Sequence, residues 1–484
     1  MARVRTSSIL MALAGLAAAC SGSSDDDDAN TATPTPPALT VRFVLPAASA
    51  PDPFPATITK YVVTLQEADG TVVVTEEFGA DDPLSIPGVD PIAGVILVLE
   101  GFDAGDTLVS RGRTLLFDLT NQDAEVSMYF SRVHEFSDVS GPYTPRAAQA
   151  VLPLTDGRVL IAGGIAPGTG VPLTNANLYD PATDTLTATA SLGTALAFPA
   201  AIALQPDVLL LAGGVDGAGD ESASAQVYVY DPVSHTGSWR PDVMRMGVAR
   251  ADHGGAPLVA GQALVMGGRE SDGLPSSSWE EFAWNGTTGT WSSGTSLGEE
   301  HLGPVAIGVG GGDAFAGGGF ENDVTIFAIR DSYVFDGASF GSPNNLAAAR
   351  GWPGVVQIDA DEWLLFGGLD GTSPGSAVAS TERLVWNGSA NHPATDDALS
   401  AAQRRGGGGL TAHGEILIIG GDTSLDGSPL APVDAVRVFN PATGAFTNFG
   451  KSPGPTVAAS VVPLPDGTTL VVTDGKVTRY NPRP

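Results

Sequence analysis

The stretch Val159-Leu160-Ile161-Ala162-Gly163-Gly164, an apolar run that ends in two glycines, is the part of the sequence that decides the fold. Similar runs recur at Val208 to Gly214, Ala263 to Gly268, Ala314 to Gly318, Trp363 to Gly368 and Ile416 to Gly421, with a degenerate copy at Thr469 to Gly475. The first glycines of the six full copies are 50, 54, 50, 50 and 53 residues apart. Self-similarity at a fixed period predicts a series of equivalent structural units.

An aromatic residue and a turn follow each copy. The aromatics precede Asp or Asn and then Pro or Gly, and they are Tyr179, Tyr230, Trp284, Phe335, Trp386, Phe439 and Tyr480. Paired glycines at strand ends let backbones approach where a side chain would not fit. The aromatics suit an apolar wedge between neighbouring units. The sequence therefore predicts repeated small β-sheets packed face to face.

This combination of period, double glycine and aromatic resembles the kelch repeat, in which each copy forms one four-stranded blade of a β-propeller. The resemblance implies an all-β fold with a seven-bladed kelch β-propeller over residues 134–484. The chain ends after the third strand of the last copy. We therefore expect the segment Glu135 to Gly141 to supply the missing strand and to close the ring.

Residues 39–133 alternate apolar and polar side chains in short runs such as Thr40 to Leu45, Tyr61 to Leu65 and Glu125 to Phe130. A period of two with turn residues between the runs predicts strands. The number and spacing of these strands resemble a small β-sandwich of immunoglobulin or prealbumin type. We expect this domain to act as a spacer.

The first 19 residues carry Arg3 and Arg5, then an apolar stretch that leads to Cys20, which is the sole cysteine. This pattern is typical of an export signal. Leu16 to Cys20 resembles a bacterial lipobox, with the leucine one place earlier than in the commonest form. The resemblance implies cleavage after residue 19, a diacylglycerol lipid on Cys20 and an outer-membrane lipoprotein that faces the periplasm or the exterior. An ordinary secretory signal is the alternative.

Residues 20–38 are rich in Ser, Asp, Thr and Pro and are expected to form a disordered tether. Over the whole chain, 54 acidic against 23 basic residues give a formal net charge of −31. Such a balance repels nucleic-acid phosphates and anionic lipid headgroups. We expect no nucleic-acid partner, no cofactor besides the lipid, membrane contact only through that lipid, and a monomer.

The loops after the double glycines are long and the turns at the other strand ends are short, so one face of the predicted ring carries long loops. Arg146, Arg250 and Arg350 each lie 17 residues before a first glycine. Arginines beside carboxylates grip carboxylated or hydroxylated ligands through paired hydrogen bonds. The candidate ligand-binding residues are Arg146, Arg250, His253, Arg350, Arg404, Glu270, Glu321, Asp370 and Asp422.

Two alternatives apply to these residues. An arginine at this position of a kelch repeat also serves a structural role, because it bonds to the backbones of neighbouring blades. His253 and His301 enter the same face, and surface or packing roles are favoured over metal binding for two isolated histidines. No catalytic residue is predicted, since no cysteine remains for copper-radical chemistry and no nucleophile elbow joins a strand to a helix.

The leading hypothesis is a surface-tethered binding scaffold that recognises a protein or a glycan through the long-loop face, without enzymatic activity. The second hypothesis is a carbohydrate-active enzyme resembling kelch-type sialate mutarotases, in which an arginine and a carboxylate converge in a closed axial pocket. The third is a structural component of the envelope that binds no ligand.

Overall fold

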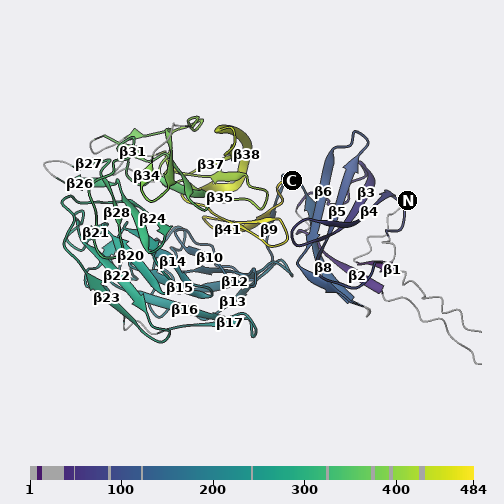
Figure 1. Ribbon diagram of the computed structural model, residues 1–484, viewed down its shortest axis with the longest axis horizontal. Coiled ribbons are helices and arrows are strands. Elements are labelled where there is room, and N and C mark those ends of the chain that lie inside the picture. The colour runs from purple at the N-terminus through teal and green to yellow at the C-terminus, as the bar shows by residue number, and fades with distance from the viewer. Residues whose placement is uncertain are drawn as a thin grey trace, which may run out of the picture.

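The computed structural model describes residues 8–12, 38–47, 50–84, 89–120, 124–240, 244–322, 326–371, 376–391, 396–423 and 431–483. Within these ranges the chain is all β, and no helix is present. Figure 1 shows two bodies: an N-terminal β domain and a larger propeller-like ring of small sheets. None of the described residues belongs to a helix long and apolar enough to span a membrane.

The N-terminal domain contains β1 (Ser8–Ala12), β2 (Ala38–Val44), β3 (Ile58–Glu67), β4 (Val72–Gly79), β5 (Ile92–Asp103), β6 (Leu108–Thr114), β7 (Phe117–Leu119) and β8 (Ala124–Arg132). Its strand order is β1-β2-β8-β6-β5-β3-β4, with β7 paired to β5. Residues Ser8–Ala12 of the predicted signal segment pair with β2. One apolar cluster, including Val41, Val63, Leu97 and Phe130, forms the core.

Hydrogen bonding joins these strands into one continuous sheet. The long strand β5 pairs with β3 along one edge and with both β6 and β7 along the other. A register shift between Ile92 and Val95 separates its pairing with β7 into two parts. Period-two alternation predicted the strands correctly, but alternation carries no information on which strands pair.

Five sheets of three or four strands follow along the chain. They are β10 to β13 (Ala150–Pro153, Val159–Ala162, Ala176–Asp180, Thr185–Ala188), β14 to β17 (Ala200–Gln205, Val208–Ala212, Ala225–Asp231, Thr236–Trp239), β19, β20, β22 and β23 (Gly254–Pro257, Gln262–Met266, Trp279–Trp284, Gly289–Ser293), β24, β25 and β28 (Val305–Gly310, Asp313–Gly317, Ser332–Phe335), and β29, β30, β33 and β34 (Gly354–Asp359, Glu362–Phe366, Thr381–Trp386, Ala390–Asn391). Within each sheet the strands are antiparallel.

The last sheet has eight strands in the order β38-β37-β36-β35-β39-β40-β41-β9. Its members are β35 (Gly407–Leu410), β36 (Ile416–Ile419), β37 (Val433–Asn440), β38 (Ala445–Thr456), β39 (Ser460–Pro463), β40 (Thr469–Thr473), β41 (Lys476–Tyr480) and β9 (Phe136–Asp138). A single parallel pair, Gly408 with Ser460, joins its two halves. The predicted closure is confirmed, because β9 pairs antiparallel with β41.

The second glycine of each repeat donates its backbone N–H to a carbonyl of the next repeat, at 2.7–2.9 Å. These acceptors, which we call the hub residues, are Leu196, Arg250, His301, Arg350, Gln403 and Thr456, and Gly475 of the last repeat returns the bond to Arg146. First glycines have φ of 64–74° and second glycines 90–117°. Both values fall in the left-handed region, where glycine is favoured.

These hydrogen bonds correct the assignment of one glycine pair. The fourth pair is Gly318-Gly319, with φ of 64° and 95°, and its first glycine is not Gly317 as the spacing predicted. Gly317 is the last residue of β25. A run of three glycines leaves the pair ambiguous in sequence, whereas the backbone conformation decides it. The corrected spacing places His301, and not Glu300, 17 residues before the pair.

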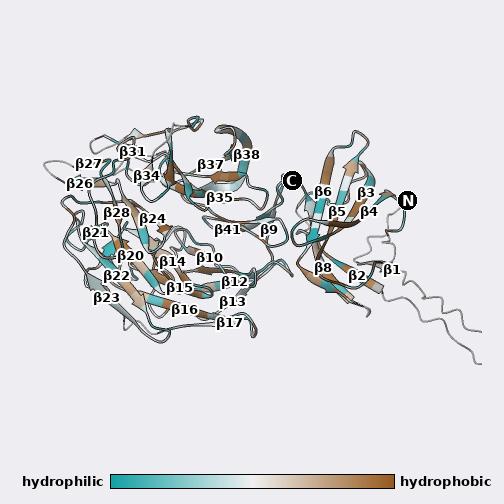
Figure 2. Ribbon diagram, in the orientation of Figure 1, coloured by the Kyte–Doolittle hydropathy of each residue, from teal (hydrophilic) through white to brown (hydrophobic). Residues whose placement is uncertain are grey.

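The repeated aromatics pack as wedges between consecutive sheets. Tyr230 of the second sheet lies in one apolar cluster with Leu152 and Leu160 of the first. Phe439 packs in the same way against Leu364 and Phe366. Figure 2 shows the apolar character of the ring strands. Truncation of a fully buried aromatic costs about 3–5 kcal/mol, so these wedges contribute strongly to the stability of the ring.

Candidate functional site

The predicted arginine ring is a structural element. Arg350 is 1% exposed, and its Nη1 donates to the carbonyls of Gly367 (3.0 Å) and Ser380 (3.1 Å). Arg250 is fully buried and repeats this arrangement with Gly267 (2.7 Å) and Ser278 (3.1 Å). These buried guanidiniums satisfy carbonyls of their own sheet.

The remaining predicted cations are also buried. Arg146 donates to the carbonyls of Asn175 and Ile161, and Arg404 forms an ion pair with Asp422 at 2.8 Å. His301 occupies a hub position, and its Nδ1 lies 2.9 Å from the Gly318 carbonyl. These partners support the structural alternative for the hub position.

His253 is half-buried and contacts the carbonyl of Ala212 through Nε2 at 3.1 Å. Burial, and secondarily Arg250, lower the pKa of His253 to about 4. The imidazole is therefore neutral at neutral pH. Its contact with a neighbouring sheet favours a packing role.

The predicted carboxylates lie in different elements of the fold. Glu270 accepts a hydrogen bond from the Ser276 hydroxyl, Asp422 is buried against Arg404, and Asp370 is exposed in β31 (Leu369–Asp370). Glu321 lies in β26 (Phe320–Asn322) of a separate two-stranded sheet. Among the described residues, no group of three or more His, Cys, Asp and Glu side chains is arranged to hold a metal ion.

A different set of side chains does meet on the long-loop face. Two positions after six of the seven hub positions, all except Thr456, the chain turns into an innermost strand with a left-handed backbone. These rim residues are Ala148, Phe198, Asp252, Gly303, Trp352 and Arg405, with φ between 48° and 66°. Backbone bonds connect neighbours in the rim: Phe198 to Ala148, Gly303 to Asp252, Trp352 to Gly303, and Arg405 to Trp352, at 2.8–3.0 Å.

Arg405 is the centre of the rim. Its guanidinium carbon lies 4.6 Å from the centroid of Trp352 and 5.7 Å from the centroid of Phe198. Its Nη2 donates to Asp252 Oδ1 at 3.1 Å. Four residues that precede the inner strands β35, β29, β14 and β19 of different sheets thus form one cluster at the axial mouth of the ring.

The left-handed backbone conformation of the rim is energetically unfavourable for residues other than glycine. Gly303 occupies the same backbone conformation without a steric penalty, whereas a bulky residue there costs of the order of 1 kcal/mol. Phe198 and Trp352 both accept this cost. The sequence analysis did not identify the rim residues, because they occupy equivalent positions in the repeats but differ in residue type. Their only common feature in the sequence is that each lies two residues after a hub residue.

The inner strands β29, β35, β39 and β10 line two cavities of about 460 and 350 Å³, and Val355 and Gly408 line both. Most lining side chains are small and apolar, including Val151, Val356, Pro463 and Gly409. Gln357 and Asp359 are the polar side chains that line the first of these cavities.

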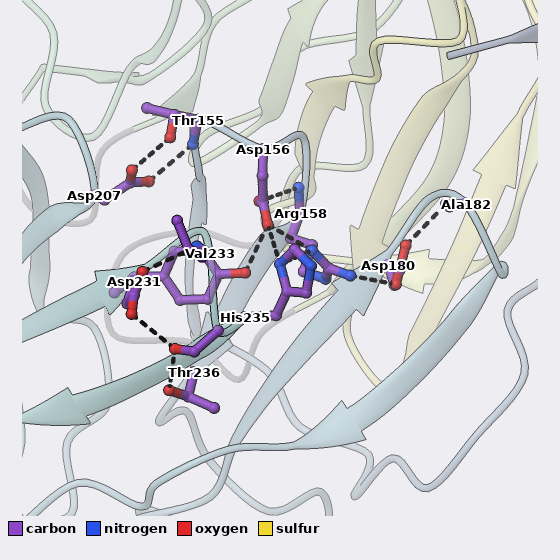
Figure 3. A network of polar contacts seen from close by, with 12 residues as sticks. Thr155, Asp156, Arg158, Asp180, Ala182, Asp207, Asp231, Val233, His235 and Thr236 are labelled. Carbon is purple, nitrogen blue, oxygen red and sulfur yellow. Dashed lines mark hydrogen bonds and ion pairs between the residues drawn. The ribbon is translucent and has the colours of Figure 1, made fainter. Parts of the chain in front are cut away.

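The short-turn face carries a second polar network (Figure 3). Asp156 accepts hydrogen bonds from Tyr230 (2.7 Å) and Arg158 (2.5 Å), and His235 Nδ1 lies 3.1 Å away. Burial raises the pKa of Asp156, but these hydrogen bonds outweigh burial and leave it below its ordinary value. Arg158 also pairs with Asp180 at 2.7 Å. The network connects turns of the first and second sheets, which is a structural role.

The fold and rim define the chain as an all-β protein with a propeller-like ring preceded by a β domain. No protein-family model matches the chain, and no curated protein matches it in sequence. A solved structure titled "Structure of YjhT" is similar with a TM-score of 0.43 and 12% identity, over 63% of this chain and 95% of that one.

Proposed function

We propose that this protein is a lipid-anchored, surface-tethered binding scaffold whose ring is a seven-bladed kelch propeller. The hub hydrogen bonds support the blade number. Seven equivalent bonds follow one another around the ring, and the seventh, from Gly475 to Arg146, completes the cycle. The eight-stranded sheet then counts as two blades, β35 to β38 and β39 to β41 with β9, which meet at the single pair Gly408 and Ser460. Cys20 carries the diacylglycerol anchor in this proposal, as its lipobox resemblance implies.

The binding surface is the long-loop face, and its partner is a protein or a glycan. The observation that carries this proposal is the rim cluster, since bulky residues at Phe198 and Trp352 accept backbone strain that glycine avoids. Strained positions of this kind concentrate at binding and catalytic sites. The cluster also combines aromatic faces with charge, which suits recognition.

Glycan arrays and pull-downs with the full chain carrying Cys20→Ser test the proposal. Trp352→Leu is expected to weaken every partner that binds the long-loop face. Arg269→Ala is the matched control, because Arg269 pairs with Glu221 at 2.7 Å on the same face but outside the rim. Equal binding by both variants, or no ligand in either assay, contradicts the proposal. The second result favours the structural-envelope hypothesis.

The enzyme hypothesis keeps one favourable observation, the approach of Asp252 to Arg405 at the axial mouth. A carboxylate beside a guanidinium suits proton transfer on a bound sugar acid. NMR of anomer exchange in reducing sugar acids tests it. An acceleration by the Cys20→Ser chain that Asp252→Asn abolishes would replace the binding proposal with catalysis.

A further inference from the structure

The environment of Arg405 has the chemistry of a receptor for a cation. Two aromatic faces, Trp352 and Phe198, lie against the guanidinium, and the Asp252 carboxylate accepts its hydrogen bond. Aromatic rings attract cations through their quadrupole, and a carboxylate adds charge and direction. These three groups come from three different sheets, so the box exists only in the assembled ring.

Arg405 is held more loosely than the hub arginines. Its side chain is 19% exposed and that of Asp252 is 17% exposed, whereas the Arg350 side chain is 1% exposed. Its guanidinium donates a hydrogen bond to Asp252 through Nη2. Arg350, by contrast, donates to two carbonyls and one hydroxyl. Displacement of Arg405 therefore disrupts fewer interactions than displacement of a hub arginine.

The negative net charge of the protein favours a cationic partner. Acidic residues exceed basic ones by 54 to 23. On the long-loop face, Asp220, Asp272 and Asp370 are exposed. A field of this sign raises the local concentration of basic partners and speeds their association.

We propose that the box of Trp352, Phe198 and Asp252 binds an arginine or lysine side chain of a basic protein partner, and that Arg405 fills the box until the partner arrives. The inference rests on the proposed function, because it assumes that the long-loop face binds a partner. A glycan is the less favoured occupant, since two aromatic faces and a carboxylate around one guanidinium match a cation better than a neutral hydroxyl.

Chemical rescue tests the box without knowledge of the partner. Arg405→Ala in the Cys20→Ser chain opens space for ethylguanidinium chloride. We expect saturable binding by titration calorimetry and a rise in Tm that the parent chain does not show. Adding Trp352→Leu or Asp252→Asn to Arg405→Ala is expected to weaken that binding roughly tenfold or more. The control is Arg269→Ala, which removes an ion-paired arginine of the same face.

A peptide experiment compares the parent chain, which retains Arg405, with the rim variants. Hexa-arginine is expected to bind more tightly to Arg405→Ala than to the parent, and more weakly to Trp352→Leu and to Asp252→Asn. If Arg405→Ala fails to fold, the two weakening variants still decide the inference. Equal responses of Arg405→Ala and Arg269→Ala to ethylguanidinium, or hexa-arginine binding that no rim variant changes, overturn it.

The two proposals fail separately. A glycan that binds the rim while ethylguanidinium and hexa-arginine do not would leave the binding scaffold standing and refute the cation box. If the box binds cations but arrays and pull-downs find no partner, the binding-scaffold proposal is contradicted. The cation box would then remain without an assigned function.

Discussion

The guanidinium of Arg479, in the ring strand β41, lies 3.7 Å from the ring centroid of Tyr129, in strand β8 of the N-terminal domain. Arg479 also donates Nε to Thr468 Oγ1 at 2.8 Å and forms ion pairs with Asp466 and Asp184. Tyr129 contacts Ser137 of the closing strand β9, and burial raises the pKa of Tyr129 to about 12. The domain thus contributes a buried side chain to the closure of the ring.

Tyr129→Leu is expected to loosen that closure. The substitution removes the aromatic face over a desolvated guanidinium, an interaction worth up to about 2 kcal/mol. Hydrogen exchange of the β41 amides that pair with β9 should accelerate under native conditions. All seven tryptophans lie between residues 239 and 386, so tryptophan fluorescence in urea should report a lower midpoint for the ring itself.

Val63→Ala is the matched control for this prediction. Val63 is 1% exposed in the domain core and lies in β3, which is separated from β8 by β5 and β6 in the sheet. It should weaken the domain while leaving β41 exchange unchanged under native conditions. Equal β41 exchange in Tyr129→Leu and the parent would mean that the domain is only a spacer, as the sequence suggested.

A second contact across this junction predicts a dependence on pH. Arg111 Nη1 donates to His413 Nε2 at 3.0 Å, and burial, with Arg111 and Arg113 nearby, lowers the pKa of His413 to about 4. The unfolded chain takes up this proton near pH 6.5. Between pH 6.5 and 4 the unfolded state binds more protons, so stability is lost as the pH falls through this window.

His413→Gln retains a hydrogen-bond acceptor for Arg111 and cannot titrate. The stability of the parent relative to His413→Gln, from urea unfolding at each pH, should rise from pH 4 to 6.5 and stay level on either side. Histidines elsewhere, such as His253, titrate in both proteins and cancel in this difference. A difference that does not vary with pH would refute the assigned role of His413.

The sequence predicted the repeating frame because the repeat requires particular residue types. A positive φ and close backbone contact select glycine at Gly163 and Gly164, and a buried wedge selects an aromatic at Tyr179. The 17-residue interval to Arg350 was equally regular, and of the two roles that the sequence left open for it the buried hydrogen bonds favour the structural one. Regular spacing across repeats indicates a role that every repeat needs, and hydrogen bonding to a carbonyl in the same sheet is such a role.

The rim was not predictable in this way. Its backbone conformation recurs, but the occupants range from Gly303 to Trp352, so no pattern marks the position. Arg405 meets Asp252 across an interval of 153 residues, which only ring closure brings together. Residues that differ from one repeat to the next cannot be identified from the pattern that the repeats share.

The structural role of the hub arginines gives a third prediction. Arg350→Ala leaves the carbonyls of Gly367 and Ser380 without a donor and the Glu382 carboxylate without its buried cation at 3.6 Å. Removing one partner of a buried pair costs about 3–5 kcal/mol. Urea unfolding should show a loss of this size, whereas Arg269→Ala, which breaks a partly exposed ion pair, should lose less than about 1 kcal/mol. Similar losses would contradict the structural assignment.

Two glycine substitutions separate backbone strain from close approach at the hub. Gly168 has φ of 79° and no atom within 4 Å of an added Cβ, so Gly168→Ala pays for strain alone, about 1 kcal/mol. Gly214 has a similar φ of 92°, but its Cβ would lie 2.2 Å from the Ala197 carbonyl oxygen. That contact is with backbone, which cannot rotate away as a side chain does. Overpacking adds about 1–3 kcal/mol or more, so Gly214→Ala should lower the urea midpoint clearly further than Gly168→Ala. Equal losses would mean that the paired glycines serve backbone conformation only, and that neighbouring sheets do not need them to pack closely.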